Sequence, residues 1–159
     1  MFLRTQFLPE SSFAGFSVEM SLAQNKTVSL WQKFMPQRKA IKSIDDFLYS
    51  IEVYPSHYFE SFDPTKSFVK WAAVRVENGS HLYPDFERLT LPEGEYAVFL
   101  HIGPPQNAPN TYGYILSEWL PNSGFELDNR PHMAIMGEKY KHGEPDSEEE
   151  FWIPIKKRD

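Results

Sequence analysis

The chain contains no cysteine. Disulfide bonds, thiolate nucleophiles and cysteine-ligated metal sites are therefore excluded. It also lacks an apolar run of about 18 residues, so no transmembrane helix is expected. The N-terminal segment, residues 1–8, is apolar but too short for the apolar region of a secretion signal, and it has no small-residue cleavage site. These features lead us to expect a cytoplasmic protein.

Positive charge is also scarce. The chain has 16 Lys and Arg against 22 Asp and Glu, a formal net charge of −6. General nucleic-acid binding requires clustered Lys and Arg that displace counterions from phosphates. The one basic run, residues 156–158, is interpreted as part of a solvated tail. We expect no direct nucleic-acid partner and no membrane partner.

Motifs for metals, cofactors and common catalytic chemistry are missing as well. No His-x-His or His-Glu-x-x-His pattern, Gly-x-Ser-x-Gly turn, phosphate loop or dinucleotide fingerprint occurs. His101 lies in an apolar run and is expected to be a hydrogen-bonded interior residue. We expect no metal and no cofactor, because the five histidines are scattered: His57, His81, His101, His132 and His142.

What the chain does contain is one pattern twice. An apolar helix reaches Pro36, and Glu52-Val53-Tyr54 follows in a strand; a second helix reaches Pro121, and Glu138-Lys139-Tyr140 follows at nearly the same distance. An apolar strand comes next in each half. With 159 residues, 41% of them hydrophobic, the chain is expected to form one compact domain that contains a duplicated unit.

The expected elements follow from periodicity and from turn residues. The second helix, starting at Pro109 or Asn110, has the clearest pattern, with an apolar stripe through Tyr112, Ile115, Leu116, Trp119 and Leu120. Gly15 lies inside a strand and predicts a bulge or a close backbone approach. Residues 1–12 are expected to be a tail, 13–76 the first repeat, 77–92 a connection and 93–156 the second repeat. Expected strands are residues 13–20, 47–54, 69–76, 96–102, 133–140 and 149–155.

Four fragments together resemble a known family. They are residues 96–104 (YAVFLHIGP), 119–124 (WLPNSG), 138–140 (EKY) and 152–155 (WIPI). In order and spacing they are similar to the C-terminal half of the GyrI-like effector-binding domains of AraC-type and MerR-type bacterial regulators. The resemblance implies an α+β fold of two β-α-β-β repeats related by a pseudo-twofold axis. Helices pack on one side of an antiparallel sheet, and a central cleft binds lipophilic, often cationic, small molecules.

The resemblance also assigns roles to residues. Glu138 matches the cleft acid, Tyr140 and Trp152 match its aromatic walls, and Trp119 and Tyr112 are further candidates on the helix stripe. A carboxylate in an apolar cleft attracts a cation, and aromatic faces add cation–π attraction.

Alternation along the strands adds further candidates but leaves their roles open. Ala134, Met136, Glu138 and Tyr140 would share one face, and Glu150 would share a face with Trp152, which makes Glu150 a second candidate acid. Both acids could instead lie on a solvated strand face. Trp119 could simply pack in the core, and Trp71 is a weaker candidate for the cleft. Aromatic residues around Tyr54, Tyr58 and Phe59 form either a dimer face or a cleft rim.

Three functions remain open from the sequence. With few residues before the first expected strand, no helix-turn-helix region is predicted, and the favoured function is a stand-alone protein that binds lipophilic, cationic aromatic compounds. The second is a cofactor-independent hydrolase of strained electrophiles, with Glu138 as general base and Tyr140 as proton donor. The third is a protein-interaction role that resembles the gyrase inhibitors, with a protein partner or a homodimer.

Overall fold

The computed structural model describes residues 1–79 and 83–159. Residues 80–82 of the expected connection, His81 among them, lie outside the described residues. Within these described residues, nine strands form one antiparallel sheet accompanied by two α-helices, which confirms the α+β class. In the described part of the chain, no helix is long and apolar enough to cross a membrane.

The strand order reveals two halves with the same connectivity. In the first half β2 (Ser11–Met20), α1 (Thr27–Phe34), β3 (Leu48–Val53) and β4 (Phe68–Val76) follow one another. In the second half the corresponding elements are β6 (Gly94–Ile102), α2 (Ala108–Tyr114), β8 (His132–Met136) and β9 (Glu148–Lys157). The sheet order β1-β6-β9-β8-β3-β4-β2-β5 joins the halves where β3 pairs with β8.

Three strands were not expected from the sequence. Residues 1–12, expected to be a tail, contain β1 (Phe2–Leu8), and the expected connection contains β5 (Glu87–Leu91). β1 pairs with β6 of the other half, and β5 pairs with β2. The short β7 (Phe125–Leu127) pairs with the end of β9. β1 and β5 are edge strands that are largely exposed, and only their last residues, Leu8 and Leu91, are buried.

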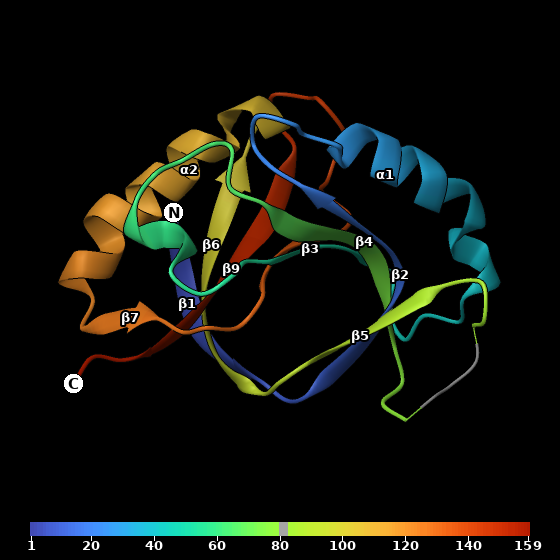
Figure 1. The fold of residues 1–159 in the computed structure, drawn as a ribbon, viewed down its shortest axis with the longest axis horizontal. Coiled ribbons are helices and arrows are strands. Elements are labelled where there is room, and N and C mark those ends of the chain that lie inside the picture. Colours follow the sequence, from blue (N-terminus) through green and yellow to red (C-terminus); the bar gives the residue numbers. More distant parts are fainter. Residues whose placement is uncertain (80–82) are drawn as a thin grey trace.

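The exchange of edge strands bends the sheet. A short link containing Pro9 leads from β1 into β2, but β1 itself pairs with β6. A short link containing Pro92 leads from β5 into β6, but β5 itself pairs with β2. Both edges of the sheet must therefore lie near each other. Figure 1 shows β1, β2 and β5 closing the lower side of the curved sheet, while α1 and α2 lie apart on its outer side.

The two faces of the sheet carry different cores. The face away from the helices buries Phe13, Ile51, Trp71, Tyr96 and Trp152 in one cluster. The other face carries one apolar cluster under each helix. Leu30 and Phe34 anchor α1 to β2 and β4, and Ile115 anchors the second helix to β6 and β9. Between those two clusters, the helix-side face carries polar and aromatic groups over β3 and β8.

The second helix differs from its expected form. α2 ends at Tyr114, and a π-turn (Ile115–Trp119) and a 3-10 turn (Leu120–Asn122) continue it. The Leu120 N–H donates to the Ile115 carbonyl, five residues back, as in a π-helix. Within the expected stripe only Ile115 is buried, and the aromatic members are partly exposed beside the sheet.

Gly15 in β2 confirms the expected close approach of two backbones. A Cβ at this position would meet the backbone carbonyl oxygen of Ala72 on β4, the neighbouring strand. Only glycine allows this contact, because it alone has no Cβ.

Candidate functional site

An open cleft of about 500 Å3 lies at one end of the helix-side face. We call it the aromatic cleft. The segment after β3, residues 54–60, forms one wall with Tyr54, Tyr58 and Phe59. The opposite wall consists of Leu120, Leu127, Asp128, Asn129, Arg130 and His132. The aromatic residues that the sequence left open as a dimer face or a cleft rim therefore line a cleft in this chain.

His132 is the centre of the aromatic groups. Its ring stacks with Phe59, at 5.2 Å between centroids, and with Tyr112, at 6.2 Å, while the edge of Tyr54 meets it at 4.9 Å. Burial, with a smaller contribution from the positive charge of Arg130, lowers the pKa of His132 from 6.5 to about 3. His132 is therefore neutral at physiological pH and acts as an aromatic surface rather than a cation.

Behind these rings lie three charged side chains, Glu52, Lys70 and Glu149, which we call the acid–lysine cluster. Glu52 is directly opposite His132 in the pairing of β3 with β8, so both side chains are on the helix side. Lys70 is opposite Glu52 on β4, and its Nζ lies 3.1 Å from Glu52 Oε1. Both side chains are largely buried, at 16% and 13% exposure.

Glu149, at the start of β9, completes this cluster. Burial raises the pKa of its carboxyl to about 7; the charge of Lys70 opposes the shift and the charge of Glu52 adds to it. Among the described residues no side chain forms an ion pair or hydrogen bond with this carboxylate. Glu149 is thus a partly buried acid whose charge changes near neutral pH.

Two tyrosines connect the cluster with the aromatic cleft. Burial raises the pKa of Tyr54 and of Tyr112 well above 10, and the charge of Glu52 adds to both shifts. The charge of Glu149 also raises the pKa of Tyr112. Both hydroxyls therefore stay protonated, and Tyr112 lies within the electrostatic reach of both acids.

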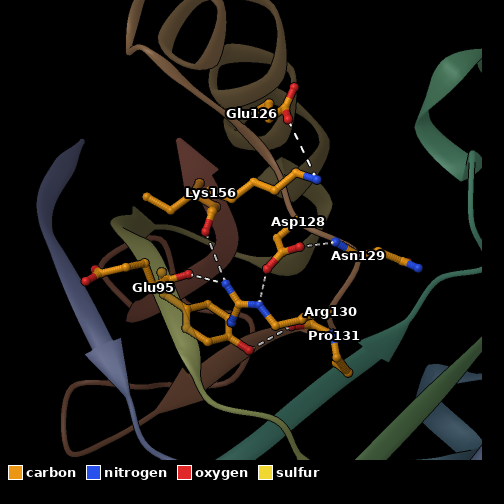
Figure 2. Close-up of polar contacts among 9 residues, drawn as sticks. Glu95, Glu126, Asp128, Asn129, Arg130, Pro131 and Lys156 are labelled. Atoms are coloured by element: carbon orange, nitrogen blue, oxygen red, sulfur yellow. Dashed lines mark hydrogen bonds and ion pairs between the residues drawn. The ribbon is translucent and has the colours of Figure 1, made fainter. Parts of the chain in front are cut away.

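Arg130 lines the aromatic cleft, and polar contacts to its neighbours hold its side chain in place (Figure 2). Its Nε donates to Asp128 Oδ2 at 2.6 Å, and a second nitrogen donates to the backbone carbonyl of Glu95 on β6. The guanidinium also lies over the Tyr96 ring, 4.8 Å from its centroid. The Asp128 carboxylate and the backbone carbonyls of Glu95 and Ile155 hold the Arg130 side chain. Arg130 therefore positions the cleft wall, and Asp128 compensates its positive charge.

The structure places the expected acid, Glu138, in an exposed turn. β8 ends at Met136, two residues before Glu138, so the expected strand over residues 133–140 is too long. Gly137 and the turn in which the Tyr140 N–H bonds back to the Gly137 carbonyl end the strand. Glu138 and Glu52 consequently do not occupy matching places in the two halves. Tyr140 lies in the same turn, and its hydroxyl is 3.2 Å from His142 Nδ1.

Three other expected residues belong to the opposite face of the sheet. Trp71 and Trp152 are buried in the core away from the helices, at 8% and 4% exposure. Glu150 shares their face, accepts a hydrogen bond from Trp152 Nε1 at 3.1 Å, and pairs with Arg4 at 3.3 Å. The alternation that links Glu150 with Trp152 is confirmed, but it directs both away from the aromatic cleft.

The two helix candidates have different environments. Tyr112 contacts His132 and lies beside the aromatic cleft, with its hydroxyl 3.5 Å from His132 Nδ1. Trp119 packs between Phe2, Phe99 and Phe125. The apolar stripe of the second helix thus brings Tyr112 to the site. Trp119 instead packs against core residues, which was the alternative to a role in the cleft.

Lys70 and Glu149 were not predicted as site residues from the sequence, although each carried a signal. Both are charged residues on the strand face that otherwise holds apolar side chains, next to Phe68 and Ala72 in β4 and next to Phe151 and Ile153 in β9. A charge at a core position is rarely placed there without a partner or a function.

Comparison with known proteins agrees with this fold. The sequence matches the family described as GyrI-like small molecule binding domain over residues 1–156. No curated protein sequence is similar enough to match. A structure of SAV2435 bound to tetraphenylphosphonium is similar with a TM-score of 0.71 and 16% identity, over 98% of this chain and 94% of that one.

Two further structures are similar at the level of the fold. The C-terminal domain of EcmrR has a TM-score of 0.65 and 17% identity, over 99% of each chain. A hydrolase from Listeria innocua has a TM-score of 0.59 and 13% identity, over 96% of this chain and 91% of that one. From the family match over nearly its whole length, this chain belongs to the GyrI-like small-molecule binding domains.

Proposed function

We propose that the chain binds lipophilic aromatic cations in the aromatic cleft on the helix side of its sheet. The aromatic cleft would hold the apolar part of the ligand, and the acid–lysine cluster behind it would supply the negative charge. The observation that carries the proposal is the position of Glu149, a partly buried carboxylate without an ion-pair partner among the described residues, beside a group of stacked rings. The binding of tetraphenylphosphonium by SAV2435, which has the same fold, supports this ligand class.

The energetics favour a cation with aromatic groups. An ionised carboxylate that loses water on burial is destabilised by several kcal/mol unless a positive charge compensates it. Each ring of Tyr54, Phe59 or Tyr112 that faces the ligand adds about 0.5 to 2 kcal/mol of cation–π attraction. Neither interaction imposes a fixed pattern of hydrogen bonds, so several flat or propeller-shaped cations should fit.

In the described structure neither Glu52 nor Glu149 lines the aromatic cleft. Tyr54 and His132 line the cleft and lie on the same strand faces as Glu52, so the two regions are continuous along β3 and β8. Phe59 belongs to a segment outside the sheet, which gives it more freedom to move than the rings on strands. Displacement of Phe59 by a ligand ring would open the path to Glu149.

Calorimetric titration with two probes of equal shape and opposite charge tests the proposal. Tetraphenylphosphonium should bind, and tetraphenylborate should bind at least about tenfold more weakly. Glu149→Gln should weaken the phosphonium about tenfold or more and leave the borate unchanged or slightly improved. Glu138→Gln, which alters the exposed acid first matched from the sequence, serves as the control. Equal affinity for both probes, or no binding of either, would exclude a cation-binding cleft.

Hydrolysis of an electrophilic ligand is the second candidate. It is favoured by the Glu149 carboxyl, whose pKa of about 7 suits a general base near neutral pH, and by Tyr112, a protonated hydroxyl within reach of its charge. Mass analysis of a bound strained electrophile after incubation tests it. A product that has gained one water, formed by the wild type and not by Glu149→Gln, would establish turnover; recovery of the intact compound would leave binding as the function.

A further inference from the structure

Lys70 gives the cluster an internal cation. Its Nζ lies 3.1 Å from Glu52 Oε1, and the two residues are direct partners in the pairing of β3 with β4. The side chains of Lys70 and Glu52 are 16% and 13% exposed, so neither can be fully hydrated in its present position. The pair is therefore held in place by strand register rather than by two flexible surface side chains.

The charge that a ligand meets depends on this pair. Lys70 and Glu52 together carry no net charge, so the cluster presents the single carboxylate of Glu149. The other titratable groups nearby are neutral: desolvation lowers the pKa of His132 and of His101, and burial raises the pKa of Tyr54, Tyr112 and Tyr140 so that their hydroxyls remain protonated. Arg130 in the cleft wall is matched by Asp128, whose Oδ2 accepts its hydrogen bond.

Placement along the sheet separates the two acids. The strands run in the order β9, β8, β3, β4, so Lys70 approaches Glu52 from the side opposite to Glu149. Glu52 has its partner on the neighbouring strand, whereas Glu149 is influenced by the charge of Lys70 without an ion pair to it. A ligand cation therefore finds Glu149 unpaired, and Glu52 only after Lys70 is displaced.

We propose that Lys70 determines the charge selectivity of the cleft by occupying Glu52 as a built-in cation, so that monocations bind in preference to dications. The inference rests on the proposed function and adds a specificity residue to it. A second positive charge on the ligand would be left without a carboxylate and would be repelled by the Lys70 ammonium. Removal of the ammonium would expose two carboxylates and reverse the preference.

Ethidium and propidium provide a matched pair of probes, because they share one fluorescent ring system and carry one and two positive charges. The ratio of their dissociation constants should favour ethidium in the wild type. In Lys70→Met, whose side chain keeps a similar length, this ratio should shift toward propidium by about tenfold or more. Lys39→Met, which removes an exposed charge from the 3-10 turn Met35–Ala40 that follows α1, should leave the ratio unchanged.

A double variant makes the test specific for the pair. Lys70→Met combined with Glu52→Gln again presents one carboxylate, so the preference for ethidium should return. An unchanged dye ratio in Lys70→Met, with a melting curve that shows a folded protein, would overturn the inference while the proposed function stands. If the wild type binds neither dye nor tetraphenylphosphonium, both the inference and the proposed function fail.

A measurement without ligand tests the same inference if the Lys70→Met variant binds both dyes too weakly for a ratio to be determined. Carbon NMR of the glutamate carboxyls should show the Glu149 titration moving to higher pH when the Lys70 charge is absent. A Glu149 titration that stays in place would mean that Lys70 does not control the charge of this site, and would overturn the inference.

Discussion

Glu52 of β3 and His132 of β8 lie directly opposite each other where the two halves of the sheet meet. The β3–β8 ladder is the backbone pairing that joins the two sets of β-α-β-β elements, and it lies between the apolar clusters under the two helices. An acid and a neutral, buried imidazole thus lie between the two helix-side apolar clusters. The proposed ligand site is built around this pair.

Cation binding should become stronger as the pH rises through 7. Burial raises the pKa of Glu149 to about 7, so below this pH a cation must first displace a proton from the carboxyl. With one linked proton, the affinity for tetraphenylphosphonium should fall by up to about tenfold per pH unit below pH 7. Titration calorimetry at pH 5.5, 6.5 and 8 measures the trend.

The control for this pH effect is Glu149→Gln. This variant should bind tetraphenylphosphonium more weakly, and its affinity should not change between pH 5.5 and 8. The surrounding titratable groups are Glu52, Lys70, Tyr112, Tyr140 and, opposite Glu149 on β6, His101. Calorimetry in two buffers of different protonation enthalpy should detect release of the proton at pH 6.5. Affinity that is constant with pH in the wild type would remove Glu149 from the binding reaction.

Acid should destabilise the fold through His132. Its pKa is about 3 in the folded chain against 6.5 when unperturbed, so between these values the unfolded chain binds a proton that the folded chain does not. The free energy of unfolding should therefore fall as the pH drops below about 6.5, by up to ~1.4 kcal/mol per pH unit. Urea unfolding at pH 7, 5.5 and 4.5 measures this loss.

His132→Phe keeps an aromatic ring between Phe59 and Tyr112 and has no titrating group. Its unfolding free energy should depend less on pH in the acid range than that of the wild type. Glu149 has the opposite effect on the pH dependence of stability. Its pKa is higher in the folded chain than in the unfolded chain, so between about pH 4.5 and 7 the folded chain binds the proton more tightly, and the contribution of Glu149 to stability falls as the pH rises through this range. The comparison between wild type and His132→Phe is therefore best made in a Glu149→Gln background.

Phe59 should contribute to ligand affinity. Phe59→Ala removes a ring that lines the aromatic cleft and stacks on His132, and should weaken tetraphenylphosphonium binding by ~0.5 to 2 kcal/mol. The control is Phe62→Ala, three residues further along the connection between β3 and β4, because the Phe62 side chain is 84% exposed and does not line the cleft described here. Equal loss in both variants would point to the segment as a whole rather than to the stacked ring.

Gly15→Ala should destabilise the fold by ~3 kcal/mol, because the new Cβ would overlap the Ala72 carbonyl oxygen on β4 and force two paired strands apart. Gly113→Ala is the matched change in α2, where an added Cβ meets no atom within 4 Å. There alanine should stabilise the helix by about 0.5 to 1 kcal/mol. Thermal and chemical unfolding of the two variants should shift in opposite directions.

Much of the framework was predictable because it depends on local patterns. Alternation and prolines located β2, β3, β4, β6 and β9, and the apolar stripe with Pro121 located the second helix to within a few residues. The end of β8 was not predictable in the same way. Residues 133–136 are apolar and Tyr140 again favours a strand, but the turn between Gly137 and Tyr140 ends the pairing at Met136. That difference alone moves Glu138 from a sheet face to an exposed turn.

The sequence by itself determined the family, the α+β class and the presence of an aromatic, acidic, small-molecule binding domain, since these depend on composition, order and short motifs. Only the tertiary structure decided which acid and which rings meet. Glu52, Lys70 and Glu149 come from three strands, and Phe59, Tyr112 and His132 from a 3-10 turn, a helix and a strand far apart in the chain. The pairing register of β3, β4, β8 and β9 brings them together, and a shift of one residue would turn each strand side chain to the opposite face.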